Sequence, residues 1–229
     1  MSKITLEGVK AQFEKDIKNH SMEVIMDNGL YRHLKFTKDG SQCYRFDIHT
    51  WPGYLCICQD MGTYVFSRIT DMFEFFIMDE RDFNHRHIIN PRYWAEKLQA
   101  VDKDSGRDSN GYEEFSTELF EEAVMNEYNQ FIEGNEIDPK SDYAEKLKEA
   151  IENEVLGAVY GGEYPAFDAA MSFSFKNDNW SLDEKYDYPE FSLAEFYEHN
   201  CRDYTFHYLW ICFAIVWGIQ EYNKSKKAQ

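Results

Sequence analysis

The spacing of apolar residues changes along this chain, and the change limits the folds open to it. Between residues 43 and 50 apolar and polar residues alternate, with Tyr44, Phe46 and Ile48 on one side. Such alternation is typical of a half-buried strand. After Phe66 the apolar residues recur at intervals of three and four, which is typical of a helix; they are Ile69, Met72, Phe73, Phe76 and Ile77.

Turn signals divide the first part of the chain into short apolar segments. They are Asp27-Asn28-Gly29, Lys38-Asp39-Gly40 and Trp51-Pro52-Gly53. Strands of about four to eight residues joined by such turns predict an antiparallel meander, here over residues 22–66. We expect its inner face to bury Tyr44, Phe46 and Ile48 together with Phe73 and Phe76.

The rest of the chain has mostly helical spacing. Pro91 predicts a helix that carries Leu98, and Ser192 with Glu195 predicts a capping box that opens another helix. Two apolar stripes have helical spacing; they are Phe115, Leu119, Ala123, Val124, Tyr128 and Phe131, and then Tyr143, Leu147, Ile151, Val155 and Ala158. The apolar run from Tyr208 to Ile219 is shorter than the roughly 20 residues of a membrane span and predicts a buried helix.

These patterns predict an α+β fold, in which an N-terminal antiparallel β-meander packed by helices precedes a mostly helical acidic half. We expect residues 1–101 to form the α+β region and residues 102–112 to form a loop or linker. Residues 113–229 are then an acidic helical region that packs back on the sheet.

Charge is divided unevenly along the chain. Residues 1–110 hold 15 basic and 17 acidic residues, and residues 111–229 hold 9 and 25, so the net charge of −18 divides into −2 and −16. Because self-repulsion lowers stability, the concentration favours a functional role, such as binding a basic partner or excluding nucleic acid. The alternative is a structural interaction module whose solvated helix faces only keep the chain soluble.

The carboxylates expected to form a partner-binding face belong to two consecutive acidic segments; they are Glu113, Glu114, Glu118, Glu121, Glu122 and Glu127, backed by Glu145, Glu149 and Glu152. The first segment continues through Glu133, Glu136 and Asp138 over about 25 residues. As a helix it presents carboxylates over about 30 Å or more, at a density of the same order as that of duplex DNA, although the DNA pattern is denser. Residues 111–175 contain three Lys and no Arg, which argues against direct phosphate contacts.

No motif for a catalytic nucleophile or a phosphate-binding loop occurs. The sequence therefore predicts no catalytic residue, no metal ligand and no cofactor. The five cysteines are odd in number and lack a C-x-x-C, which argues against a disulfide framework. Cys56 and Cys58 share one face of an expected strand, but no second pair follows, so we expect small core thiols rather than a zinc site.

Several segments resemble a family of uncharacterised accessory proteins of tailed phages and prophages. They are DNGLYRHLKF, YRFDIHTWPGYLCICQDMGTYVFSRITDMFEFF, INPRYWAEKLQA and YLWICFAIVWGIQEYN, whereas residues 113–190 are less similar. The resemblance implies a mobile-element setting but no activity. By analogy with other small acidic phage proteins, it implies a counter-defence factor of the anti-CRISPR or anti-restriction type.

The expected function is thus a phage-encoded counter-defence inhibitor that acts as a DNA mimic. Its partner would be a basic host protein or nucleoprotein complex, such as a CRISPR effector or restriction enzyme, without direct nucleic-acid or membrane contact. The start of the chain lacks the apolar stretch of a signal peptide, so we expect the host cytoplasm. An alternative is an accessory enzyme or nucleic-acid-handling factor with a pocket near Trp51-Pro52-Gly53 and the pair His85 and His87.

Overall fold

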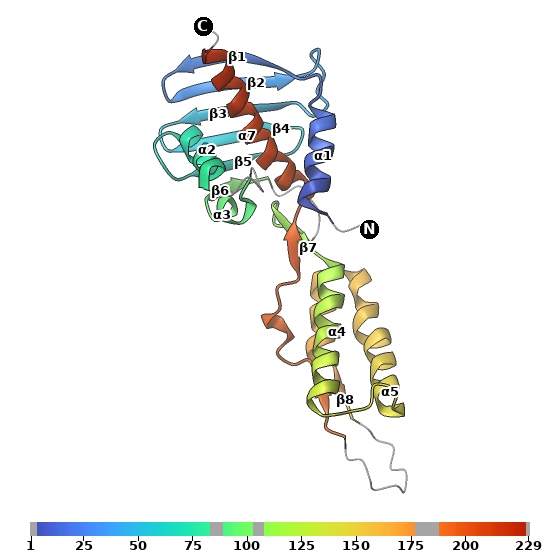
Figure 1. The fold of residues 1–229 in the computed structure, drawn as a ribbon. Coiled ribbons are helices and arrows are strands. Elements are labelled where there is room, and N and C mark those ends of the chain that lie inside the picture. The colour runs from blue at the N-terminus through green and yellow to red at the C-terminus, as the bar shows by residue number, and fades with distance from the viewer. Residues whose placement is uncertain (1–3, 83–88, 103–107, 177–187, 228–229) are drawn as a thin grey trace, which may run out of the picture. The chain divides into compact units, whose positions relative to one another are not determined.

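The chain has the predicted α+β fold. The computed structural model describes residues 4–82, 89–102, 108–176 and 188–227. It divides into two compact units (Figure 1). The first, here called the sheet unit, comprises residues 1–114 and 204–229. The second, the helical unit, comprises residues 115–203.

The sheet unit contains a six-stranded antiparallel meander in which every strand pairs with the next along the chain. Its strands are β1 (Ser21–Asn28), β2 (Tyr31–Thr37), β3 (Phe46–Trp51), β4 (Tyr54–Gln59), β5 (Tyr64–Ser67) and β6 (Leu98–Val101). The predicted turns at Gly29 and Gly53 have positive φ, +62° and +85°, which glycine adopts without steric cost.

Strand β6 corrects one expectation. Leu98 was expected on the helix that begins at Pro91, but that helix, α3 (Pro91–Ala95), ends after five residues. The Ser67 amide donates to the Lys97 carbonyl (3.0 Å), and the chain continues as β6 beside β5. Pairing there satisfies backbone groups that the edge of a five-stranded sheet would leave open.

Three helices pack on one face of the sheet: α1 (Leu6–Asp16), α2 (Met72–Asp82) and α7 (Phe206–Lys227) (Figure 1). The strand side chains buried beneath them alternate along the strands as predicted; they are Leu34, Phe36, Phe46, Ile48, Leu55, Ile57, Tyr64 and Phe66. Phe73 and Phe76 are buried with them. Tyr44 differs, because it precedes β3 with a φ of +56° and is only partly buried against Trp210.

The division of the chain differs from the expected one at the C-terminus. Helix α7 belongs with the sheet unit rather than with the acidic helices. Its residues from Tyr208 to Val216 are all buried, so the helix is apolar around its whole circumference. Such a helix needs apolar neighbours on every side, and the inner sheet face with α1 and α2 supplies them.

The chain enters the helical unit at the end of β7 (Glu113–Phe115) and leaves it at β10 (Arg202–Tyr204). Strands β7 and β10 pair with each other. The further elements of the helical unit are α4 (Thr117–Gly134), α5 (Asp142–Ala150), a π-helical turn (Ile151–Val155), a 3-10 segment (Leu156–Gly161), α6 (Glu163–Ser172), β8 (Ser174–Phe175), β9 (Phe191–Ser192) and a 3-10 turn (Phe196–Glu198). The expected capping box at Ser192 is wrong, because Ser192 ends β9 and pairs with Ser174.

The apolar stripes of the helical unit agree only in part with the sequence prediction. Four residues of α4 are buried, Phe120, Val124, Tyr128 and Ile132, whereas Phe115 and Phe131 are only partly buried at the edge of the core. Within the described ranges of the chain, no helix has both the length and the apolar character needed to cross a bilayer.

Candidate functional site

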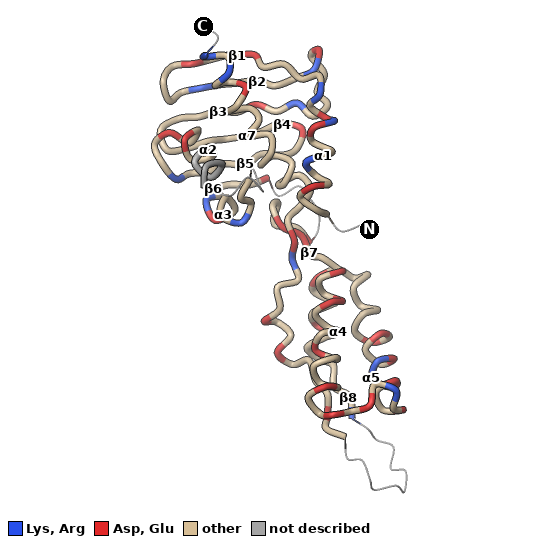
Figure 2. Tube along the Cα trace, viewed as in Figure 1, with Lys and Arg blue, Asp and Glu red and all other residues tan. Residues whose placement is uncertain are grey.

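The net charge follows the division into folding units. The helical unit, residues 115–203, contains 22 acidic and 6 basic residues, which gives −16 of the total of −18 and leaves −2 for the sheet unit. Figure 2 shows acidic positions along α4 with no basic position between them. The imbalance therefore coincides with one compact unit, which a single continuous segment of the chain forms.

Helix α4 has acidic side chains and no basic ones. It carries five Glu and no Lys or Arg in 18 residues. Its N-terminus is capped by Ser116, whose hydroxyl accepts from the Leu119 amide (3.2 Å), and Glu118 in the first turn is favoured by the helix dipole. Its last turn holds Glu133 and no basic residue, which the dipole disfavours. Helix stability thus does not explain the charge.

The predicted partner-binding carboxylates separate into groups. Glu118, Glu121 and Glu122 are exposed on α4, and Glu145, Glu149 and Glu152 are exposed on or just after α5. Glu113 and Glu114 lie outside the predicted helix, on β7 in the sheet unit, and are half-buried. The reason is local: Ser116 caps α4, so the helix cannot include the residues before it.

The two acidic helices differ in how far their charge is neutralised. On α5, Lys146 lies 2.7 Å from Asp142, and Lys148 lies 3.9 Å from Glu152. Figure 2 shows basic positions among the acidic ones on α5. Helix α4 therefore provides the longer run of charge without basic residues, and α5 adds a mixed surface.

Glu127 lies on another side of α4, nine residues or about 180° from Glu118, and lines a pocket of about 600 Å³. Its Oε1 is 3.0 Å from Nε2 of His199. The remaining lining residues come from one segment; they are Ser192, Leu193, Ala194, Glu195, Phe196, Glu198 and His199. Three carboxylates around a hollow of this size can accept a Lys or Arg side chain. The sequence did not indicate the pocket, because its segment was expected to be helical.

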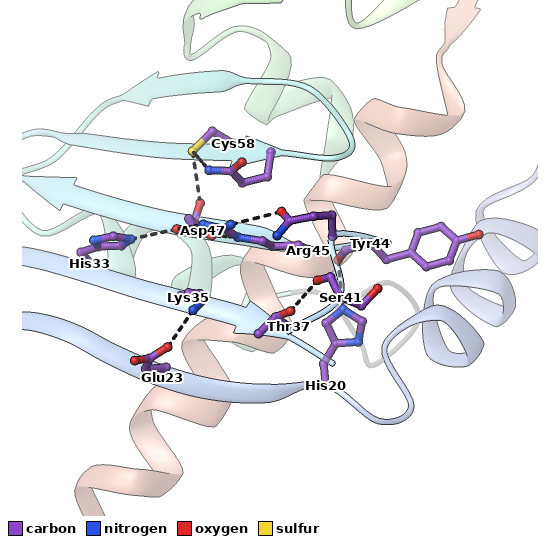
Figure 3. A network of polar contacts seen from close by, with 12 residues as sticks. His20, Glu23, His33, Lys35, Thr37, Ser41, Tyr44, Arg45, Asp47 and Cys58 are labelled. Atoms are coloured by element: carbon purple, nitrogen blue, oxygen red, sulfur yellow. Dashed lines mark hydrogen bonds and ion pairs between the residues drawn. The ribbon is translucent and has the colours of Figure 1, made fainter. Parts of the chain in front are cut away.

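A second polar cluster lies on the sheet face opposite the core. Strand pairing places His33 opposite His49, Asp47 opposite Cys58, and His49 opposite Cys56. Adjacent strands β2, β3 and β4 thus bring five side chains together that alternate with the buried residues. Figure 3 shows His33, Arg45 and Cys58 arranged around Asp47.

Asp47 is the buried centre of this cluster, with 3% of its side chain exposed. Its Oδ1 accepts from Arg45 Nε (3.0 Å), and its Oδ2 lies 2.9 Å from His33 Nε2. Burial by itself would raise the pKa of the carboxyl, but the hydrogen bonds from Arg45 and His33 overcome burial and hold that pKa below its usual value. The carboxylate is therefore ionised at neutral pH.

Cys58 is a polarised thiol beside this carboxylate. Hydrogen bonds from Cys56 and then from His49 lower the pKa of Cys58 to about 5, although burial opposes the shift. The hydrogen bond between Cys56 and Cys58 raises the pKa of Cys56. The hydrogen bond between His49 and Cys58 raises the pKa of His49. The expectation that Cys56 and Cys58 are core thiols is wrong: Leu55 and Ile57 take the core positions of β4, and both cysteines lie half-buried on the other face.

The expected enzyme pocket lies only partly within the described residues. Trp51-Pro52-Gly53 forms the β3–β4 turn, where the Trp51 and Tyr54 rings stack at 5.2 Å and remain partly exposed. His85 and His87 lie outside the described residues. The alternative of an accessory enzyme at this turn stays a prediction.

No family model, curated protein or solved structure matches this chain. The resemblance to phage accessory proteins therefore stays a prediction.

Proposed function

We propose that this protein is a binding protein whose helical unit presents an acidic surface to a basic partner. The observation that carries the proposal is the segregation of charge, −16 on the helical unit against −2 on the sheet unit. A charge that served only solubility would not need to be confined to one folding unit. Confinement instead gives one part of the molecule a strong field that attracts a basic surface.

Two features of the helical unit give this surface a shape. Helix α4 extends over about 27 Å, at about 1.5 Å per residue, without a basic side chain. The pocket with Glu127, Glu195 and Glu198 adds a recess that suits a single Lys or Arg. The exposed charges of α4 form a line that resembles a phosphate backbone more than a generally solvated surface does, and the recess lies on the opposite side of the same helix.

The partner class follows from this chemistry. A basic groove that normally binds nucleic acid has Lys and Arg spaced to meet phosphates, and an acidic helix can occupy it. With the resemblance to phage accessory proteins, this supports a counter-defence inhibitor that occupies the nucleic-acid groove of a host CRISPR effector or restriction enzyme. The protein then competes with DNA as a mimic.

The test begins with the full chain immobilised and exposed to lysate of a bacterium that carries CRISPR and restriction systems. A basic nucleic-acid-binding protein should be retained at low salt and released at 1 M salt, where screening acts over about 3 Å. Duplex DNA should compete with the chain for the purified partner. Retention that is unaffected by both salt and DNA would contradict the proposal.

A matched pair of variants then locates the surface. Glu121/Glu122/Glu133→Gln removes three exposed charges from α4, and Glu7/Glu14/Glu74→Gln removes three exposed charges from the sheet unit. We expect the α4 variant to slow association by about tenfold or more at low salt, because charge complementarity acts mainly on the association rate. The control variant should bind at close to the wild-type rate. Equal slowing in both would mean that only the total charge matters.

A further inference from the structure

The outer face of the sheet brings together donor atoms of the kinds that bind transition metals. One nitrogen of His33, one nitrogen of His49 and one oxygen of Asp47 all lie within 4.8 Å of one another. In a tetrahedral zinc site with bonds of about 2.0–2.3 Å, neighbouring ligand atoms are about 3.3–3.8 Å apart. Small side-chain rotations therefore suffice to converge the three atoms on one ion.

A fourth donor, Cys58, lies beside this group, with its sulfur more than 4.8 Å from at least one of the three atoms. Cys58 lies directly opposite Asp47 in the β3–β4 register, and its Sγ is 4.0 Å from the Asp47 carbonyl oxygen. It also contacts His49. Two imidazoles, one carboxylate and one thiolate make a donor set that suits Zn²⁺ and the similar ion Co²⁺ better than Mg²⁺ or Ca²⁺.

We propose that His33, Asp47, His49 and Cys58 form a binding site for a divalent transition-metal ion of the zinc type. The His33 and His49 rings now stack, with centroids 4.0 Å apart, so binding turns them until their lone pairs converge. The Oδ2 atom of Asp47 lies 2.9 Å from His33 Nε2 and now also accepts from Arg45 Nη2 (3.2 Å). It becomes the ligand when the metal takes the place of that Nη2 contact, while Arg45 Nε keeps its hydrogen bond to Oδ1. Metal-bound carboxylates are commonly held by such a second hydrogen bond.

The proposed metal ligands lie on the outer face of the sheet, so their effect on metal binding can be tested without changing the core. His33, His49 and Cys58 are half-buried on the face opposite the helices, whereas their strand neighbours Leu34, Ile48 and Ile57 form the core. Replacing the three donor residues should therefore leave the core intact.

The experiment uses the untagged full chain after chelator treatment, titrated with Zn²⁺ and with Co²⁺. We expect one ion per chain. His49→Asn should weaken affinity by more than about 100-fold, since loss of an outer-shell partner alone costs roughly 10–100-fold. His207→Asn, at an exposed histidine elsewhere in the sheet unit, is the matched control and should bind like the wild type. No binding by the wild type, or a difference between the two variants of less than about tenfold, would overturn the site.

Cobalt spectroscopy tests the fourth ligand. The wild-type complex should show the intense visible bands of a tetrahedral ion and a thiolate-to-cobalt charge-transfer band. Cys58→Ser should lose the charge-transfer band, whereas Cys56→Ser and Cys43→Ser should keep it. A six-coordinate spectrum, or loss of the band in Cys56→Ser alone, would refute the assignment. The wild-type spectrum is decisive even if a variant fails to fold.

Discussion

At the scale of single residues, Gly218 shows how closely α7 approaches the sheet. A Cβ atom at this position would lie 2.8 Å from Ile48 Cδ1 and 3.0 Å from Phe36 Cζ. Both neighbours are fully buried, so neither side chain can move into open space. Glycine costs about 1 kcal/mol relative to alanine inside a helix, and the close contact explains why glycine nevertheless stands in the middle of α7.

We therefore predict that Gly218→Ala destabilises the protein by about 1–3 kcal/mol, despite the better helix propensity of alanine, because overpacking a filled core has this cost. The free energy of unfolding in denaturant measures the effect. Ile48→Val removes the atom nearest the new methyl group, so the double variant should lose less stability than the two single changes together. If Gly218→Ala is neutral or stabilising, the contact is looser than the distances indicate.

At the scale of elements, Arg32 on β2 contacts residues at the start of α2 and lies 5.7 Å from the ring of Tyr222 on α7. Its guanidinium donates to both carboxylate oxygens of Asp71, at 2.9 and 2.8 Å, and lies over the ring of Phe73 at 4.5 Å. Asp71 also accepts from the Phe73 amide (3.0 Å) at the start of α2. Burial alone would raise the pKa of Asp71, but the Arg32 and Phe73 hydrogen bonds lower it below the usual 3.8.

Asp71→Asn should cost about 2 kcal/mol at pH 7, since it leaves a largely buried Arg32 without its counter-charge. Because the folded pKa is below the unfolded one, this stabilisation is present above pH 3.8 and disappears as the pH falls through the folded pKa. Denaturant unfolding at several pH values should therefore show the wild-type advantage shrinking in acid. A gap that stays constant with pH would mean that the pair acts through packing rather than charge.

At the scale of the whole molecule, the helical unit is inserted into the sheet unit. In the sheet unit the Thr205 amide donates to the Tyr112 carbonyl (2.9 Å), and in the helical unit the Ser116 amide donates to the Cys201 carbonyl (2.8 Å). The chain thus leaves and re-enters each unit at nearly the same point. Insertions with adjacent ends are compatible with independent folding of the host unit.

Replacing residues 115–203 by a short glycine-containing turn should leave the sheet unit folded, because its core is formed by residues on either side of the deletion. The shortened chain should unfold cooperatively and keep the near-ultraviolet signal of its buried aromatic residues. It should also lose the salt-dependent partner while retaining cobalt binding. Loss of cooperative unfolding would show that the sheet unit needs the inserted residues.

The sequence by itself determined the elements whose signals are local. Alternation around Phe46 and Ile48 and the glycine turns specify the meander, and helical spacing from Met72 to Phe76 specifies α2, because strand and helix periods depend only on neighbouring residues. The acidic composition of the second half could also be read from the sequence, whereas the position at which Ser116 caps α4 decided which acidic residues lie on that helix.

Only the tertiary structure decided which distant residues meet. The pairing of β2 with β3 and of β3 with β4 places His33, His49 and Cys58 around Asp47, and a shift of one residue in register would turn each side chain to the other face. The return of the chain brings Glu195 and Glu198 to Glu127, and the all-round burial of α7 assigns it to the sheet unit. These outcomes depend on long-range packing, which local periodicity does not encode.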